Sequence, residues 1–219
     1  MNGSKAIALL SQKGGSGKTT VTMQLAAALV LRGYRVAVAD LDPQESATRW
    51  AESAPADAPF PARMLRPLGD TEEIRQTLWT ATREVDFILF DCPPSIEHPH
   101  MVSALELCDF AIVPVVPSPT DLWSTRAIEK VILKRIRSGR LQRAALLPNR
   151  VMRTALAADV LEVMRDFSLP VLDAALSQRS AYAQSAVMGA SVYELGRTAA
   201  PAQEEVDRLV SVVLEQLGE

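Results

Sequence analysis

The sequence predicts an α/β fold in which a doubly wound, mostly parallel sheet is flanked by helices. Short apolar runs alternate along the chain with longer segments that carry apolar residues at spacings of three and four. The short runs are apolar throughout, as in strands that are buried on both faces of a parallel sheet. The expected strands are residues 6–10, 36–39, 87–90, 110–116 and 144–147.

The segments between and after these runs have the periodicity of amphipathic helices. We expect helices at residues 19–31, 44–52, 72–83, 96–107, 122–137, 156–167 and 202–217. Gly33 stands where the first helix should stop, and Asp70 with Glu73 has the spacing of a capping box. Residues 53–67 hold four prolines and are interpreted as a surface excursion, because apolar strands continue on both sides. Residues 1–219 are expected to form a single domain.

Composition and charge exclude several classes of protein. With 48% hydrophobic and 22% charged residues, the 219-residue chain is neither disordered nor fibrous. Its net charge of -3 means that any nucleic-acid site must be a local patch. Cys92 and Cys108 lack the spacing of metal ligands and are interpreted as buried thiols of a reducing cytosol. Without a signal peptide or a membrane span in the sequence, we expect a soluble cytoplasmic protein.

Residues 11–20 join the first expected strand to the first helix and are rich in glycine. Glycines at such a junction let successive N–H groups converge, and the helix N-terminus adds partial positive charge, which suits a polyphosphate. Lys18 would reach the β- and γ-phosphates, and the Thr19 hydroxyl suits Mg²⁺. The general pattern G-x-x-x-x-G-K-[ST] is broken at Gln12, where its first glycine would stand. The nucleotide-binding residues expected here are Gly14, Gly15, Ser16, Gly17, Lys18, Thr19 and Thr20.

Residues 13–20 resemble the deviant Walker A loop of the ParA/MinD family of partitioning and positioning ATPases. The resemblance implies a P-loop NTPase domain that binds ATP and Mg²⁺ and hydrolyses the ATP. It also implies that Lys13 reaches across an ATP-sandwich homodimer to the phosphates held by the other subunit. A cation that arrives in trans makes dimerisation depend on the nucleotide, as an arginine finger does in other phosphoryl-transfer proteins. The alternative for Lys13 is a solvated loop lysine.

Acidic residues end two of the expected strands. Asp40 and Asp42 follow the second strand and Asp91 follows the third, at the edge where a doubly wound sheet binds its ligands. By the resemblance, Asp42 positions the attacking water, Asp91 is the Walker B acid that holds Mg²⁺, and Asp40 supports the metal or the loop. A helix N-cap is the alternative for Asp42. The resemblance thus implies the catalytic residues Lys13, Lys18 and Asp42 and the metal site Thr19, Asp91 and Asp40.

Two later segments also resemble the family. Residues 113–121 are proline-rich, like the stretch that borders the dimer interface in ParA proteins. Asn149 stands where the family places an asparagine beside the adenine. Because a carboxamide offers both a donor and an acceptor, Asn149 would favour ATP over GTP. A turn asparagine is the alternative.

Positive charge is concentrated between residues 126 and 153, where nine basic residues face one acidic residue. Lys130, Lys134 and Arg137 are spaced to share one helix face. Small ParA proteins without a helix-turn-helix domain bind DNA non-specifically through such residues, so the resemblance implies a DNA surface that includes these three residues. Arg179 is expected to be a further phosphate contact. A solvated helix face is the alternative.

These features together predict a small ParA-type ATPase. The resemblance implies an ATP-dependent homodimer, non-specific DNA, a ParB-like or cargo adaptor protein as activating partner, and a nucleoid-associated location. A MinD-like membrane-cycling ATPase is one alternative, although residues 202–217 are acidic and aliphatic, unlike a membrane-targeting helix. A metabolic ligase of the dethiobiotin-synthetase type is another, although Lys13 followed by two glycines argues against it.

Overall fold

The structure, a computed structural model, describes residues 3–67, 69 and 71–219. Its described residues form a six-stranded sheet in the order β3-β2-β4-β1-β5-β6, and every neighbouring pair of strands is parallel. The strands are β1 Lys5–Leu9, β2 Val36–Asp40, β3 Arg63–Leu65, β4 Phe87–Asp91, β5 Phe110–Val115 and β6 Arg143–Pro148. The predicted doubly wound parallel sheet is confirmed.

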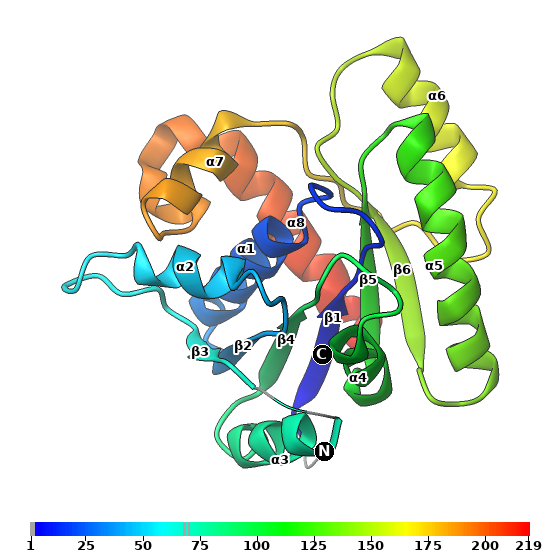
Figure 1. Ribbon diagram of the computed structural model, residues 1–219. Helices are drawn as coiled ribbons and strands as arrows, with labels where there is room; N and C mark the ends of the chain where they lie inside the picture. Colours follow the sequence, from blue (N-terminus) through cyan, green and yellow to red (C-terminus); the bar gives the residue numbers. More distant parts are fainter. Residues whose placement is uncertain (1–2, 68, 70) are drawn as a thin grey trace.

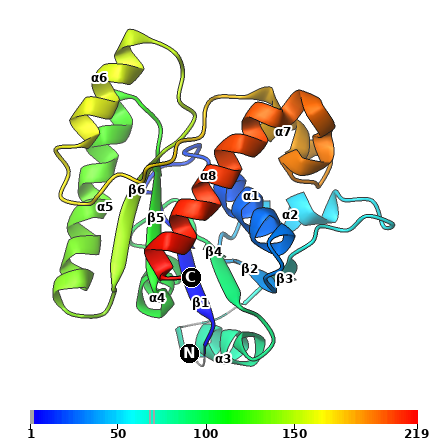
Figure 2. The same ribbon diagram turned by 180° about the vertical axis from the view of Figure 1, so that it is seen from behind.

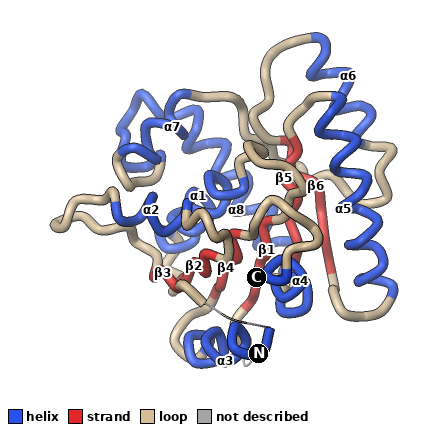
Figure 3. Tube along the Cα trace, viewed as in Figure 1, coloured by secondary structure: helices blue, strands red, loops and turns tan. Residues whose placement is uncertain are grey.

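Helices cover both faces of the sheet, as Figures 1 and 2 show from opposite sides. The α-helices are α1 Lys18–Leu31, α2 Ser46–Glu52, α3 Thr71–Thr82, α4 Pro99–Leu107, α5 Pro119–Arg137, α6 Ala155–Met164, α7 Ser180–Val187 and α8 Ala200–Leu217. A 3-10 segment, η1 Val192–Ala199, leads into α8. Figure 3 shows the strands running between the two helical layers.

Two apolar cores fill the space between the sheet and these layers. On one face, Ile7 and Leu9 of β1 join the core formed with α1, α2, α7 and α8. On the other face, Ala6 and Ala8 of the same strand join the core formed with α3, α4, α5 and α6. Successive side chains of a strand point to opposite faces, so a strand with helices on both sides must be apolar at every position. This is why the strands appear in the sequence as uninterrupted apolar runs.

The strand order places β1 between β4 and β5, which follow it in the chain on opposite sides. The chain therefore builds β2, β3 and β4 on one side of β1 and then β5 and β6 on the other, and a crevice opens at the carboxyl end of β1, where the direction changes. The loop that follows β1 lies in this crevice. Asp40 and Asp91 are register partners on β2 and β4, so both acidic strand ends lie on the same edge.

Two local predictions differ from the structure. Residues 53–67 are not wholly a surface excursion, because Arg63–Leu65 pair with β2 as the edge strand β3. A strand of three partly exposed residues has no apolar run from which it could be predicted. Helix α7 was not predicted either, since its eight residues carry only a short apolar pattern. The predicted capping box lies outside the described residues at Asp70.

The predicted C-terminal helix is confirmed as α8, which packs against α1. Its buried face consists of Ala202, Val206, Leu209, Val210, Val212, Val213 and Leu214. None of the helices within the described ranges combines the length and the apolar composition needed to cross a membrane.

Candidate nucleotide-binding site

The loop between β1 and α1 turns sharply at two glycines. Gly15 and Gly17 have φ values of 81° and 85°, in the left-handed region that side chains other than glycine rarely adopt. A Cβ at Gly17 would lie 2.4 Å from Nδ2 of Asn149, so the position also lacks room for a side chain. Gly17 occupies the N-cap position of α1 and has no side chain that could accept a hydrogen bond there. The first N–H groups of the helix are therefore available to a ligand. The loop has the geometry of an anion cradle.

Two buried polar side chains in the loop indicate which ligand the cradle suits. Oγ of Ser16 is buried and, among the described residues, is the one buried side-chain oxygen or nitrogen without a hydrogen-bond partner. Lys18 is only 7% exposed. Burial lowers the pKa of Lys18, and the nearby Asp91 acts in the opposite direction. A buried cation beside an unpaired hydroxyl at a helix N-terminus fits a polyphosphate.

Asp91 lies beside the first turn of α1. Oγ1 of Thr19 donates to Oδ2 of Asp91 at 2.7 Å, and Oγ1 of Thr22 donates to Oδ1 at 3.3 Å. Complete burial raises the pKa of Asp91 to about 7, despite the Thr19 hydrogen bond and the nearby Lys18. A buried carboxylate next to a threonine hydroxyl is an oxygen donor set of the kind that Mg²⁺ takes. The structure thus brings together two of the predicted metal residues, Thr19 and Asp91.

Asp40 holds the loop that follows β2. Its Oδ2 accepts hydrogen bonds from N and Oγ1 of Thr48 at 2.8 and 2.9 Å, and its Oδ1 accepts one from N of Asp42 at 3.3 Å. Burial raises the pKa of Asp40, and the hydrogen bonds from Thr48 oppose this shift. These contacts join Asp40 to the backbone of Asp42 and to Thr48 of α2. Its role toward a metal stays a prediction.

Asp42 is half-buried at the mouth of the crevice. Its Oδ1 accepts a hydrogen bond from N of Gln44 at 2.9 Å. The N-cap of α2 is Glu45, so the alternative interpretation of Asp42 as a helix cap is wrong. The carboxylate remains close enough to Lys18 and Asp91 to affect both of their pKa values. This is a place from which a carboxylate can orient a water at the phosphate cradle.

His100 connects the Asp42 loop to α4, a contact that no pattern in the sequence predicts. Nδ1 of His100 donates to the carbonyl of Leu41 at 2.8 Å. The ring of His98 lies edge-on to that of His100, with 4.8 Å between the ring centroids. His100 and Leu41 are 59 positions apart in the chain, so spacing alone carries no signal for the contact.

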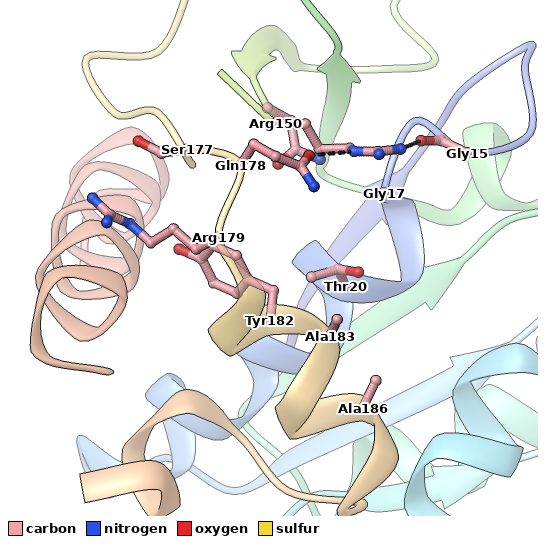
Figure 4. Close-up of a pocket in the computed structure, with 11 residues that line it drawn as sticks. Gly15, Gly17, Thr20, Arg150, Ser177, Gln178, Arg179, Tyr182, Ala183 and Ala186 are labelled. Carbon is pink, nitrogen blue, oxygen red and sulfur yellow. Dashed lines mark hydrogen bonds between the residues drawn. The ribbon is translucent and has the colours of Figure 1, made fainter. Parts of the chain in front are cut away.

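A cavity of about 320 Å³ opens beside the loop, between it and α7 (Figure 4). Asn149 lies on its wall, where Nδ2 donates to the carbonyl of Ser16 at 2.7 Å. A cavity of this size accommodates a nucleoside. The structure therefore places Asn149 beside both the loop and the cavity, while its contact with adenine stays a prediction. The cavity is lined by Gly15, Gly17, Thr20, Asn149, Arg150, Ser177, Gln178, Arg179, Tyr182, Ala183 and Ala186.

Arg150 joins two other lining residues of this cavity, a contact that no sequence motif predicts. Its Nη1 donates to the carbonyl of Gly15 at 2.9 Å, and its Nε donates to Oε1 of Gln178 at 2.8 Å (Figure 4). The backbone of Arg150 has a φ of 53°, which is strained for a residue with a side chain. Two hydrogen bonds to different segments hold this conformation.

Lys13 lies at the part of the loop that contacts α5. Its Nζ bonds Oδ2 of Asp121 at 3.0 Å and Oγ1 of Thr120 at 3.3 Å, both in the first turn of α5. Its side chain is 47% exposed. Lys13 is therefore a half-exposed loop lysine with a carboxylate partner in its own chain, and the alternative of a solvated loop lysine stays open. Its role in trans stays a prediction.

The basic residues of α5 divide into paired and unpaired ones. Arg126 and Arg135 form ion pairs with Glu129 and Glu106. The predicted DNA-binding residues of α5 are exposed, and within the described part of the chain no carboxylate pairs with them; they are Lys130, Lys134 and Arg137. Arg179, by contrast, is bound to Glu205 at 2.8 Å. DNA binding by these residues stays a prediction, and the ion pair gives Arg179 a structural role.

Both cysteines are buried free thiols, as predicted. Burial raises the pKa of Cys92 and of Cys108 above the usual thiol value. Across the described ranges, no group of three or more histidine, cysteine or acidic residues forms a metal cluster.

A glycine-rich loop at the switch point of a parallel sheet, with a buried lysine and a strand-end aspartate beside a threonine, defines a P-loop nucleotide-binding protein. Residues 7–192 match the CobQ/CobB/MinD/ParA nucleotide binding domain, and the chain belongs to this family. It is an ATPase of the ParA type.

Several similar proteins cover nearly the whole chain, and others cover part of it. The Maintenance of carboxysome distribution protein A of Halothiobacillus neapolitanus is 33% identical over 95% of both chains. The chromosome-partitioning ATPase Soj of Thermus thermophilus is 32% identical over 65% of this chain and 67% of its own. Among solved structures, Cyanothece apo McdA has a TM-score of 0.78 at 18% identity and covers 96% of this chain and 99% of its own. MinD of Pyrococcus horikoshii with Mg-ADP has a TM-score of 0.72 at 20% identity over 98% of both chains.

Proposed function

We propose that this ATPase closes as a face-to-face homodimer over bound ATP, holds DNA non-specifically in that state, and separates after hydrolysis to position a protein cargo. The observation that carries the proposal is the difference in exposure between the two loop lysines. Lys18 is buried in the phosphate cradle, whereas Lys13 is half-exposed and pairs with Asp121. An exposed cation beside the cradle is available to a second subunit's phosphates.

Each site residue has one task in the proposed reaction. Lys18 and the N–H groups at the start of α1 hold the phosphates, while Thr19 and Asp91 hold Mg²⁺. Bound there, Mg²⁺ would neutralise the negative charge that develops on the phosphates. Asp42 orients the attacking water, and the hydrogen bonds of Asp40 keep the Asp42 loop in place. Orientation and charge are the main contributions that a protein makes to phosphoryl transfer.

The proposed DNA surface is the outer face of α5. Lys130, Lys134 and Arg137 are exposed there and unpaired among the described residues. A monomer presents one such face and a dimer presents two, so ATP should strengthen DNA binding through avidity. This surface would associate the ATP-bound protein with the nucleoid.

The proposed cargo is a protein assembly. Two relatives are proteins that maintain carboxysome distribution, and both match this chain over nearly its full length. The proposed partner is a cargo adaptor of the ParB-like kind with a basic segment that stimulates hydrolysis. Such a segment would be attracted by the negative charge of the protein outside α5 and β6.

Light scattering with each nucleotide tests the proposal. The 23.8 kDa protein should double in mass with Mg-ATP and stay monomeric with Mg-ADP. In fluorescence anisotropy, ATP should tighten binding to two unrelated DNA duplexes equally. A protein that stays monomeric with ATP, or a DNA affinity that ignores the nucleotide, would contradict the proposal.

A further inference from the structure

Glu205 of α8 accepts several hydrogen bonds from one short segment. Its Oε1 accepts from Oγ of Ser177 at 2.6 Å and from Nε and Nη2 of Arg179 at 3.0 and 2.8 Å. Its Oε2 accepts from N of Ser177 at 3.0 Å and from the hydroxyl of Tyr182 at 2.9 Å. One carboxylate thus holds three residues where the loop after α6 enters α7.

The same segment forms one wall of the cavity beside the phosphate loop. Its side chains alternate in direction: Ser177 and Arg179 point toward α8, whereas Gln178 points toward the loop (Figure 4). Gln178 accepts the hydrogen bond from Arg150, and Arg150 in turn donates to the carbonyl of Gly15. A continuous chain of contacts therefore runs from Glu205 to the phosphate loop.

Polar contacts anchor this wall on two sides. On the side of β6, N of Val151 donates to the carbonyl of Leu176, and N of Gln178 donates to that of Val151. On the side of α8, the side chains of Ser177, Arg179 and Tyr182 all bond Glu205. Removing the Glu205 carboxylate therefore loosens the second side and leaves the backbone contacts of the first side intact.

Hydrogen bonds from neighbouring residues stabilise the ionised form of Glu205. Burial alone would raise its pKa, but the hydrogen bonds from Arg179 and Ser177 lower the pKa below the usual value of a glutamate. Its side chain is 16% exposed. Glu205 therefore stays ionised at neutral pH, and the ion pair with Arg179 is shielded from solvent more than a surface pair.

We propose that Glu205 is a positioning residue for nucleotide binding, which sets the wall formed by residues 177–182 at the distance that the nucleoside end of ATP requires. The inference rests on the proposed function, because it assigns the cavity to the nucleoside. Glu205 lies outside the cavity lining and acts only through Ser177, Arg179 and Tyr182. Its effect should fall on the nucleoside, because the wall meets the phosphate loop at the carbonyl of Gly15, an acceptor that does not bind phosphate, and because the contacts of Lys18 and Thr19 do not involve the wall.

Calorimetric titrations with Mg-ATP and with Mg-tripolyphosphate separate the two ends of the nucleotide. We expect Glu205→Gln and Glu205→Ala to weaken ATP binding by about tenfold, the value of one charge-assisted hydrogen bond, and to leave tripolyphosphate binding unchanged. Arg179→Gln should also lower the ratio of the ATP affinity to the tripolyphosphate affinity. Glu204→Gln is the matched control, because Glu204 is its exposed neighbour on α8.

Parallel losses of ATP and tripolyphosphate affinity, or an unchanged ATP affinity in a folded Glu205→Gln protein, would overturn the inference. If Glu205→Ala fails to fold, Glu205→Gln and Arg179→Gln carry the test. A wild-type protein that binds no ATP would overturn the proposed function itself, which distinguishes that failure from a failure of the Glu205 inference.

Discussion

The phosphate loop and the outer face of α5 are both rich in polar side chains, but they differ in how these side chains are held. Around the loop, Asn149 bonds Ser16, Arg150 bonds Gly15, and Thr19 bonds Asp91. On the outer face of α5, the exposed cations Lys130, Lys134 and Arg137 pair with no carboxylate in the described part of the chain. The first region is fixed by long-range contacts and the second is free to follow its ligand.

This difference separates two kinds of recognition. A fixed cradle selects its ligand by geometry, since each donor is already aimed before the ligand arrives. Free surface cations select only charge, and salt screens them. Substitutions in the loop should therefore weaken the binding of one ligand strongly, and this loss of affinity should depend little on salt. Substitutions on α5 should weaken the binding of any polyanion by a smaller factor, and this loss of affinity should depend strongly on salt.

The largest effect is expected for Lys18→Ala. The lysine is buried, so its removal leaves phosphate charge without a partner, which costs about 4 kcal/mol or about 1,000-fold in ATP affinity. Equilibrium binding of a fluorescent ATP analogue measures this loss. Lys130→Ala serves as the control, because Lys130 is exposed. ATP binding by Lys18→Ala within tenfold of the wild type would contradict the assignment of the cradle.

A smaller effect, on turnover alone, is expected for Asp42→Ala. Loss of a group that orients the attacking water should slow hydrolysis by about 100-fold. Because Asp42 lies outside the loop, ATP should still bind, and the variant should accumulate as a dimer in size-exclusion chromatography with Mg-ATP. Phosphate release is the measurement, with the exposed Asp57→Ala as control. Normal turnover would remove Asp42 from the mechanism.

Lys13→Ala should weaken the dimer while sparing nucleotide binding. Each lysine would give up its half-exposed pair with Asp121 to reach the partner's phosphate, so we expect a net gain of about 1 kcal/mol per contact. Two contacts in a symmetric dimer correspond to about 30-fold in the dimer dissociation constant.

Light scattering and nucleotide binding on the same Lys13→Ala sample test this expectation. Asp121→Asn is the informative control, since it frees Lys13 from its partner in the same chain. That variant should dimerise with ATP at least as well as the wild type. If Lys13→Ala dimerises as tightly as the wild type, Lys13 acts only within its own chain.

The smallest effect is expected on α5. Reversing the charges of Lys130, Lys134 and Arg137 should weaken DNA binding by about tenfold, because exposed contacts contribute only a few tenths of a kcal/mol each. The slope of log affinity against log salt should become shallower by about 0.9 for each DNA phosphate that is no longer neutralised. The control, Arg49→Glu with Arg83→Glu and Arg197→Glu, changes the net charge equally on other exposed surfaces. Equal slopes for the two triple variants would move the DNA site away from α5.

The sheet, the phosphate loop and the family could all be predicted from consecutive residues. Strands buried on both faces must be apolar throughout, and a loop that turns at Gly15 and Gly17 before Lys18 needs its residues in one order. These are local requirements, so neighbouring positions carry them. For the same reason the ATPase class followed from residues 11–20 and was confirmed by the family match. The roles of Asp42, Asn149 and Lys13 remain predictions.

The long-range contacts that hold the site together could not be predicted from the sequence and are seen only in the tertiary structure. Lys13 meets Asp121 across 108 positions, and Arg150 meets Gly15 across 135. Helix α7 and the edge strand β3 are too short to show a clear apolar pattern in the sequence. Their stability comes from packing against neighbouring elements. Glu205 is one of several acids on α8, and what sets it apart is the segment folded against it. Such pairings have no fixed spacing, because they depend on which elements the parallel sheet brings side by side.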